Sequence, residues 1–110
     1  MLHLVNQKIE IRNLIKPNGG ITLSQGDNSD TLSMQGGLKI IMYYKNDTCY
    51  TSEATMPLAY MNMVTQKMNH DSYKKAKENE WISPSGKIKV DITILKSSNQ
   101  FITLTTQNKE

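Results

Sequence analysis

The stretch that most constrains the fold is "KIKVDITIL", Lys87 to Leu95, in which apolar and polar residues alternate. In an extended chain the apolar residues share one face: Ile88, Val90, Ile92 and Ile94. The polar residues between them share the other face. A period of two is typical of a β-strand with one buried face and one solvated face.

A second strand is predicted directly after it. "KSSN" is typical of a turn, and "QFITLTTQ" again alternates, with Ile102 and Leu104 opposite Phe101, Thr103 and Thr105. The two segments therefore predict a C-terminal hairpin.

Two further strands are predicted in the middle of the chain. "LKIIMYYK", Leu38 to Lys45, is nearly apolar on both faces, which indicates a central strand. Asn46 and Asp47 tolerate the positive φ values of a tight turn, and "TCYTSEA" then returns as the next strand.

The N-terminal region predicts another hairpin. "KIEIRNLI" and "GITLSQ" flank "PNGG", Pro17 to Gly20, which is a strong turn signal. The polar, glycine-rich stretch "GDNSDTLSMQGG", Gly26 to Gly37, is expected to be the longest flexible loop.

One region has helical periodicity. "MPLAYMNMVTQKMNHDSYKKAKENE" begins with Pro57, which suits a first helical turn. An apolar stripe follows at three-to-four spacing: Leu58, Met61, Val64 (or Thr65) and Met68. Asn69 and Asp71 favour turns and caps, so we expect the helix to break at "NHD" and to restart with Asp71 or Ser72 as N-cap.

These elements predict a single α+β domain over residues 1–110. We expect a mostly antiparallel sheet of about six strands, in the order ββββ-α-ββ, with one helix or broken helix packed on one face. A chain of this length buries enough surface to fold without metal or disulfides.

Composition narrows the functional classes. The formal net charge is +3, but of the 13 lysine and arginine residues only Arg12 is an arginine. Arginine is the usual reader of guanine edges and phosphates, so sequence-specific nucleic-acid recognition would be unusual for this chain. Abundant Lys, Asn and Ile with so little Arg is typical of AT-biased coding, as in many phages and mobile elements. A lone Cys49, with no secretion signal and no long apolar run, predicts a cytoplasmic protein without membrane association.

The sequence contains no catalytic, metal or cofactor motif. His70, Asp71 and Ser72 are consecutive, so their side chains diverge and cannot converge as a triad. His3 and His70 lie far apart, and with one cysteine they do not make a zinc site. "GDNSD" lacks the spacing of a calcium loop, and neither Gly-Gly pair belongs to a phosphate-binding loop. We therefore expect no enzyme activity and no cofactor.

Two groups of residues are candidate contacts. Lysines with an interleaved tyrosine would suit a polyanion, a protein interface or plain solvation: Lys67, Tyr73, Lys74, Lys75 and Lys77 on the helix, with Lys87 and Lys89 on the wet face of the fifth strand. Tyr60 and Met63 fall off the apolar stripe and would suit an adaptable apolar contact, or extra burial.

The leading hypothesis is a small non-enzymatic binding protein, a stoichiometric inhibitor or accessory factor that acts on a protein partner, of phage or mobile-element origin. Its contact would be a sheet face, a sheet edge or the Met/Tyr flank of the helix. The alternative is a sequence-tolerant binder of single-stranded DNA or RNA. An enzyme with a dispersed site and a self-assembling structural subunit are further alternatives.

Overall fold

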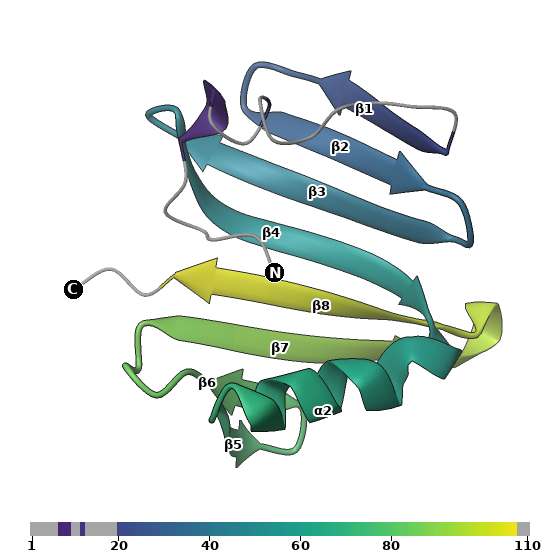
Figure 1. The fold of residues 1–110 in the computed structure, drawn as a ribbon, viewed down its shortest axis with the longest axis vertical. Coiled ribbons are helices and arrows are strands. Elements are labelled where there is room, and N and C mark those ends of the chain that lie inside the picture. Colours follow the sequence, from purple (N-terminus) through teal and green to yellow (C-terminus); the bar gives the residue numbers. More distant parts are fainter. Residues whose placement is uncertain (1–6, 10–11, 13–19, 108–110) are drawn as a thin grey trace.

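The computed structural model describes residues 7–9, 12 and 20–107, in which eight strands form one sheet (Figure 1). Their order across the sheet is β1-β2-β3-β4-β8-β7-β6-β5, and all neighbours pair antiparallel. The first four strands are β1 (Ile21–Gln25), β2 (Ser29–Met34), β3 (Leu38–Lys45) and β4 (Thr48–Pro57). The other four are β5 (Lys74–Lys77), β6 (Glu80–Ile82), β7 (Ile88–Leu95) and β8 (Gln100–Gln107). Between strands lie the 3-10 turns η1 (Leu58–Tyr60) and η2 (Lys96–Ser98), and the helix α2 (Met61–His70).

The predicted α+β class, with an antiparallel sheet and one helix, is confirmed, but about six strands in the order ββββ-α-ββ is wrong. The observed order is ββββ-α-ββββ. The expected long loop contains β2, because Asp30, Leu32 and Met34 alternate inward and pair with β3. The polar and glycine-rich composition of that stretch concealed this alternation.

The first predicted strand is also wrong where it is described. Lys8, Ile9 and Arg12 are helical, although Gln7 bridges Thr48. The remainder of "KIEIRNLI" and most of "PNGG" lie outside the described residues. Its predicted partner "GITLSQ" does form β1.

The helical region is shorter than predicted, because the residues after the apolar stripe do not continue as a helix. The apolar stripe is confirmed, since Leu58, Met61, Val64 and Met68 all pack in the core. Helix α2 ends at His70 with Asp71 as C-cap, so the predicted helical restart is wrong. Ser72 takes a left-handed φ of 64°, and the chain then turns directly into β5.

One predicted detail in the middle of the chain is confirmed. Asn46 and Asp47 take positive φ values of 52° and 63° in the tight turn between β3 and β4. Cys49 is packed as a small core residue and is 1% exposed.

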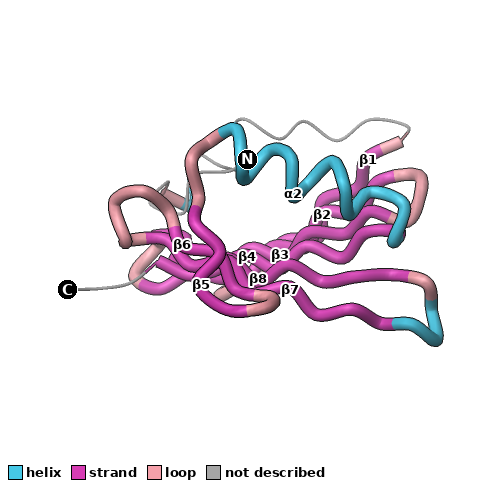
Figure 2. Tube along the Cα trace, turned by 90° about the horizontal axis from the view of Figure 1, so that it is seen from below, coloured by secondary structure: helices cyan, strands magenta, loops and turns pink. Residues whose placement is uncertain are grey.

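The core divides into two clusters on the inward face of the sheet, which is the face that carries α2 (Figure 2). On the β1–β4 half the buried members are Leu32, Met42, Tyr44 and Cys49. On the β5–β8 half they are Met68, Trp81, Val90, Ile92 and Phe101, and these pack with the helix. One ten-residue helix covers only part of so broad a sheet.

A partly buried ion pair fixes Arg12 to the sheet. Asp30 is 0% exposed, and Arg12 donates to both of its oxygens, from Nε at 2.9 Å and from Nη2 at 2.7 Å. Tyr44 donates its hydroxyl to the same carboxylate at 2.8 Å. Burial alone raises the pKa of Asp30, but the hydrogen bonds from Arg12 and Tyr44 outweigh it and hold that pKa below its usual range. The only arginine thus has an intramolecular partner.

Replacing Asp30 should strongly destabilise the fold. Asp30→Asn leaves the Arg12 guanidinium without its counter-charge, and removing one partner of such a pair should lower the free energy of unfolding by about 3 kcal/mol. The lower part of the usual range applies because the Arg12 side chain is 25% exposed. Urea unfolding at pH 7 measures this loss.

Asp27→Asn is the matched control, because Asp27 is an exposed carboxylate in the neighbouring turn. Since the folded pKa of Asp30 lies below its unfolded value of about 3.9, its stabilisation is complete above that pH and is lost as the pH falls through the folded pKa. The Asp30→Asn variant should therefore show a flatter stability profile below about pH 4. If the stability of Asp30→Asn and of Asp27→Asn fell equally below about pH 4, the stabilising role of the Asp30 carboxylate would be contradicted.

Candidate ligand-binding groove

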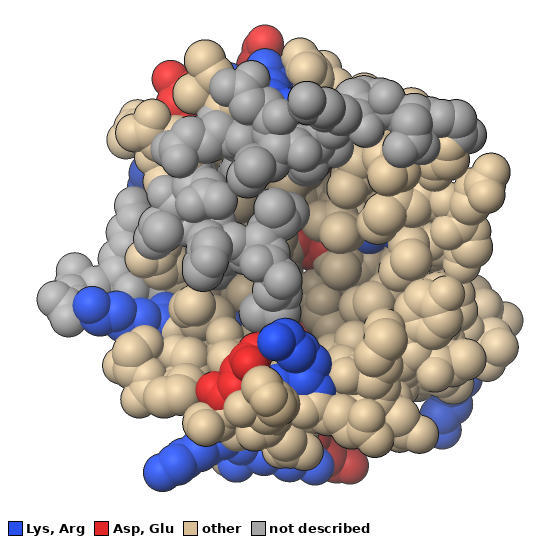
Figure 3. Space-filling view, in the orientation of Figure 1, with Lys and Arg blue, Asp and Glu red and all other residues tan. Residues whose placement is uncertain are grey.

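A groove of about 410 Å³ lies between α2 and the inward face of the sheet and is partly open to solvent. Its apolar walls come from both layers: Ile40, Ala54, Met56, Met63, Val64, Met68, Tyr73 and Val90. In the space-filling view of this side, much of the right-hand surface is uncharged (Figure 3). The groove thus lies between the two core clusters, where Ile40 contacts one cluster and Met56 the other.

The floor of the groove is polar because of the orientation of β8. Phe101 is completely buried and points inward, so the period of two also turns Thr103 and Thr105 inward. On the neighbouring strand β4 their register partners are Ala54 and Ser52. Three small hydroxyl side chains, Ser52, Thr103 and Thr105, therefore line the groove at the junction of β4 and β8.

These hydroxyl groups have no hydrogen-bond partner among the residues that the structure describes. Thr103 and Thr105 are only 7% and 8% exposed. No completely buried side-chain nitrogen or oxygen of the described chain lacks a partner, so these hydroxyls retain contact with the open space of the groove. An apolar groove with a few convergent, unpaired hydroxyls is the usual composition of a small-molecule site.

The rim of the groove is charged. Lys67 and His70 each approach a carboxylate oxygen of Asp71 at 3.3 Å. These contacts lower the pKa of Asp71, and the contact with His70 has the largest effect. Tyr73 lines the groove nearby, and burial raises the pKa of its phenol. The rim therefore keeps an ionised carboxylate beside two basic side chains at neutral pH.

The predicted contact residues are spread over several surfaces. Met63, Lys67 and Tyr73 all line the groove, and Met63 is 60% exposed at its edge. Tyr60 is half-buried against the core cluster below the helix. Tyr60 lies in η1, and Met63 and Lys67 lie in α2. Tyr73, which was predicted on the helix, lies in the connection between α2 and β5.

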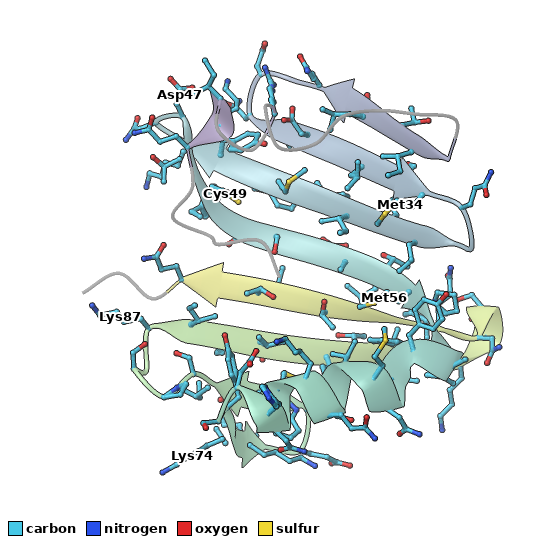
Figure 4. The ribbon with its side chains drawn as sticks, viewed as in Figure 1. Met34, Asp47, Cys49, Met56, Lys74 and Lys87 are labelled. Carbon is cyan, nitrogen blue, oxygen red and sulfur yellow. The ribbon has the colours of Figure 1, made fainter. Side chains whose placement is uncertain are left out.

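The remaining predicted lysines do not align on the helix. Lys74, Lys75 and Lys77 lie on the short edge strand β5, because the helix ends before them. Lys89 lies on β7, within 3.6 Å of Asp91, and Lys87 precedes that strand. Figure 4 shows Lys74 beside β5 and Lys87 at the start of β7. No described surface combines all these lysines with Tyr73.

The described residues contain little that points to other chemistry. They hold no group of three or more His, Cys, Asp or Glu side chains able to bind a metal ion. Burial raises the pKa of the Cys49 thiol, which disfavours the nucleophilic thiolate. None of the described helices is long and apolar enough to cross a membrane.

Comparison with known protein families, curated proteins and solved structures gave no match. The groove and its hydroxyls therefore have to be interpreted from their own geometry and chemistry.

Removing a groove hydroxyl should stabilise the protein. In Thr103→Val or Thr105→Val a methyl replaces a nearly buried hydroxyl that has no partner, so the free energy of unfolding should rise by about 0.5–1.5 kcal/mol. Urea unfolding monitored by circular dichroism measures the gain. Thr93→Val is the control, because Thr93 is exposed on the opposite face of β7 and its replacement should change stability by less than about 0.5 kcal/mol. Destabilisation by both groove substitutions would show that the hydroxyls have a structural role.

Proposed function

We propose that this chain is a small, non-enzymatic, cytoplasmic binding protein whose groove takes up an apolar molecule with one hydrogen-bonding group. The observation that carries the proposal is the groove itself, about 410 Å³ with apolar walls and unpaired hydroxyls on its floor. Ligand pockets of proteins typically measure about 300–1,000 Å³ and have this mixture of lining groups.

The walls favour an apolar and variable ligand body. Met56, Met63 and Met68 reach the groove from β4 and α2. Methionine side chains are unbranched and polarisable, so they adapt to ligands of different shape. Transfer of the ligand from water to these walls supplies the main driving force.

The floor favours a ligand with a hydroxyl, carbonyl or similar neutral group. Ser52 and Thr105 are register partners on adjacent strands, so their side chains are neighbours. Each hydroxyl can donate one hydrogen bond and accept others. A single polar group on the ligand would satisfy them and would fix its orientation in the groove.

Filling the groove should abolish binding. The uncharged fluorophore N-phenyl-1-naphthylamine should become brighter on entering the groove of the native protein, and 1-decanol should displace it. Ala54→Phe places a ring in the groove and should remove both effects, because Ala54 lines the groove at the junction of β4 and β8. Fluorescence titration measures the dissociation constants.

Thr55→Phe is the matched control, since it adds the same ring to the opposite face of β4. Thr105→Val should retain the fluorophore but bind 1-decanol about 3–10-fold more weakly, which is the equivalent of one hydrogen bond. The proposal fails if neither molecule binds the native protein, or if both bind Ala54→Phe as well as Thr55→Phe.

A second candidate function, contact with a protein partner, is supported by the outward face of the sheet. The orientation of β8 that turns threonines inward also turns Ile102 and Leu104 outward, and Leu104 is 36% exposed. Ile41 and Tyr43 lie on the same face of β3. No described helix covers this face (Figure 2). An inhibitor or accessory factor of phage or mobile-element origin would bind its target there.

The outward face can be tested by affinity capture from the native host. The unmodified protein should retain a discrete protein at a fixed stoichiometry, and Leu104→Lys should lose it because a charge replaces the apolar centre of the face. Thr22→Lys, on the same face far from Leu104, is the control. Retention of the partner by Leu104→Lys excludes this surface. Loss of the captured material after nuclease treatment would instead favour binding to single-stranded nucleic acid.

A further inference from the structure

The outer edge of β1 carries backbone groups that pair with no other described strand (Figure 1). The N–H of Gly26 donates to the carbonyl of Ser29 at 2.8 Å, and the N–H of Gln35 donates to that of Gly20 at 3.1 Å. These bonds set the alternation of the β1–β2 ladder, in which the even-numbered residues of β1 face β2. The backbone N–H and C=O groups of Ile21, Leu23 and Gln25 therefore point to the open edge.

Within the described residues, the strand at this edge lacks the features that normally prevent strand addition. "ITLSQ" contains no charge and no proline, and its register with β2 is regular over five residue pairs. The opposite edge strand, β5, has four residues, three of them lysines, and its register with β6 is interrupted. Short length, lysines and irregular register are the usual means by which a sheet edge is protected. Among the residues that the structure describes, protection is thus present at one edge of the sheet and absent at the other.

We propose that the β1 edge binds a second copy of this chain, as an antiparallel strand pair related by a two-fold axis. The axis passes beside Leu23 and pairs Leu23 with the same residue of the partner, so that Ile21 pairs with Gln25. In this register every outward backbone group of β1 meets a complementary group, and each pair exchanges two hydrogen bonds.

The side chains of β1 are compatible with this register. Thr22 falls opposite Ser24 on the outward face, a pairing of hydroxyl residues that is favourable between strands. On the inward face Leu23 contacts its own copy, which extends the core cluster of the β1–β4 half across the axis. The strand carries no charge, so the two-fold axis brings no like charges together. This self-complementarity favours a second copy over an unrelated peptide.

The two-fold axis is perpendicular to the sheet, so the inward faces of both copies lie on the same side. Both grooves then open in the same direction, and no residue of β1 lines them. Dimer formation therefore does not depend on ligand binding. A contact limited to one five-residue strand is at the small end of specific interfaces, and we expect a dissociation constant on the order of 10–100 μM.

Sedimentation velocity over a concentration series tests the association. The native full-length chain should change from monomer at about 1 μM to dimer at a few hundred micromolar. Gln25→Pro should remain monomeric, because proline removes an outward N–H without removing any bond of the β1–β2 ladder. Gln25→Ala keeps that N–H and should dimerise like the native chain. Circular dichroism of both variants confirms that they are folded.

Disulfide trapping tests the register. In the Leu23→Cys variant the two cysteines lie about 5.5 Å apart between Cα atoms, within the range of a disulfide, and mild oxidation should give a covalent dimer. In Thr22→Cys the two cysteines are diagonal neighbours about 7–8 Å apart and should cross-link poorly. The native Cys49 is buried, so cross-linking of the native chain gives the background level for both cysteine variants.

The proposal is overturned by a native chain that remains monomeric at every concentration, or by a dimer that Gln25→Pro retains. Equal cross-linking of both cysteine variants overturns the register and with it the two-fold pairing at Leu23. Binding of 1-decanol is measured separately, so its failure leaves these results unaffected.

Discussion

The pairing of β4 with β8 is the contact on which the rest of the structure depends. It joins two four-stranded antiparallel units into one sheet, with register partners from Thr51 and Thr106 to Pro57 and Gln100. The N–H of Leu58 donates to the carbonyl of Asn99 at 3.0 Å, so the start of the helical region is tied to the turn before β8. This long-range closure positions α2 over the sheet and creates the groove. Pairing β4 with β8 closes the long chain segment between them, which costs conformational entropy. We therefore expect this pairing to form late in folding.

Local sequence patterns predicted those strands, turns and helices for which the residue pattern allows only one secondary structure. The alternation at Lys87 to Leu95, the Asn46–Asp47 turn and the apolar stripe from Leu58 to Met68 all have a single physical solution. Errors occurred where polar residues are placed by tertiary contacts. Asp30 is polar in sequence, yet Arg12 and Tyr44 allow its complete burial. The stretch around Lys75 contains helix-forming residues, but pairing with β6 makes it a strand.

The groove could be predicted from sequence only in part. The alternation of β8 places Ile102 and Leu104 on one face and Thr103 and Thr105 on the other, but it does not determine which face is inward. Average burial preferences would turn the aliphatic pair inward. Phe101 shares a face with the threonines, however, and its burial turns the threonines inward instead. The strand thus gives up apolar burial at the centre of the sheet. Lower stability at this position is what the proposed binding groove would require.

The lysine-rich strand β5 also limits how large an assembly this chain can build. Backbone pairing propagates only where a sheet has an open edge at both ends, and three lysines on four residues close one of them. Any assembly through the other edge uses the same surface of each copy and therefore ends at two. Under the proposed edge pairing, this β-rich chain would therefore end at a dimer and would not extend into fibrils.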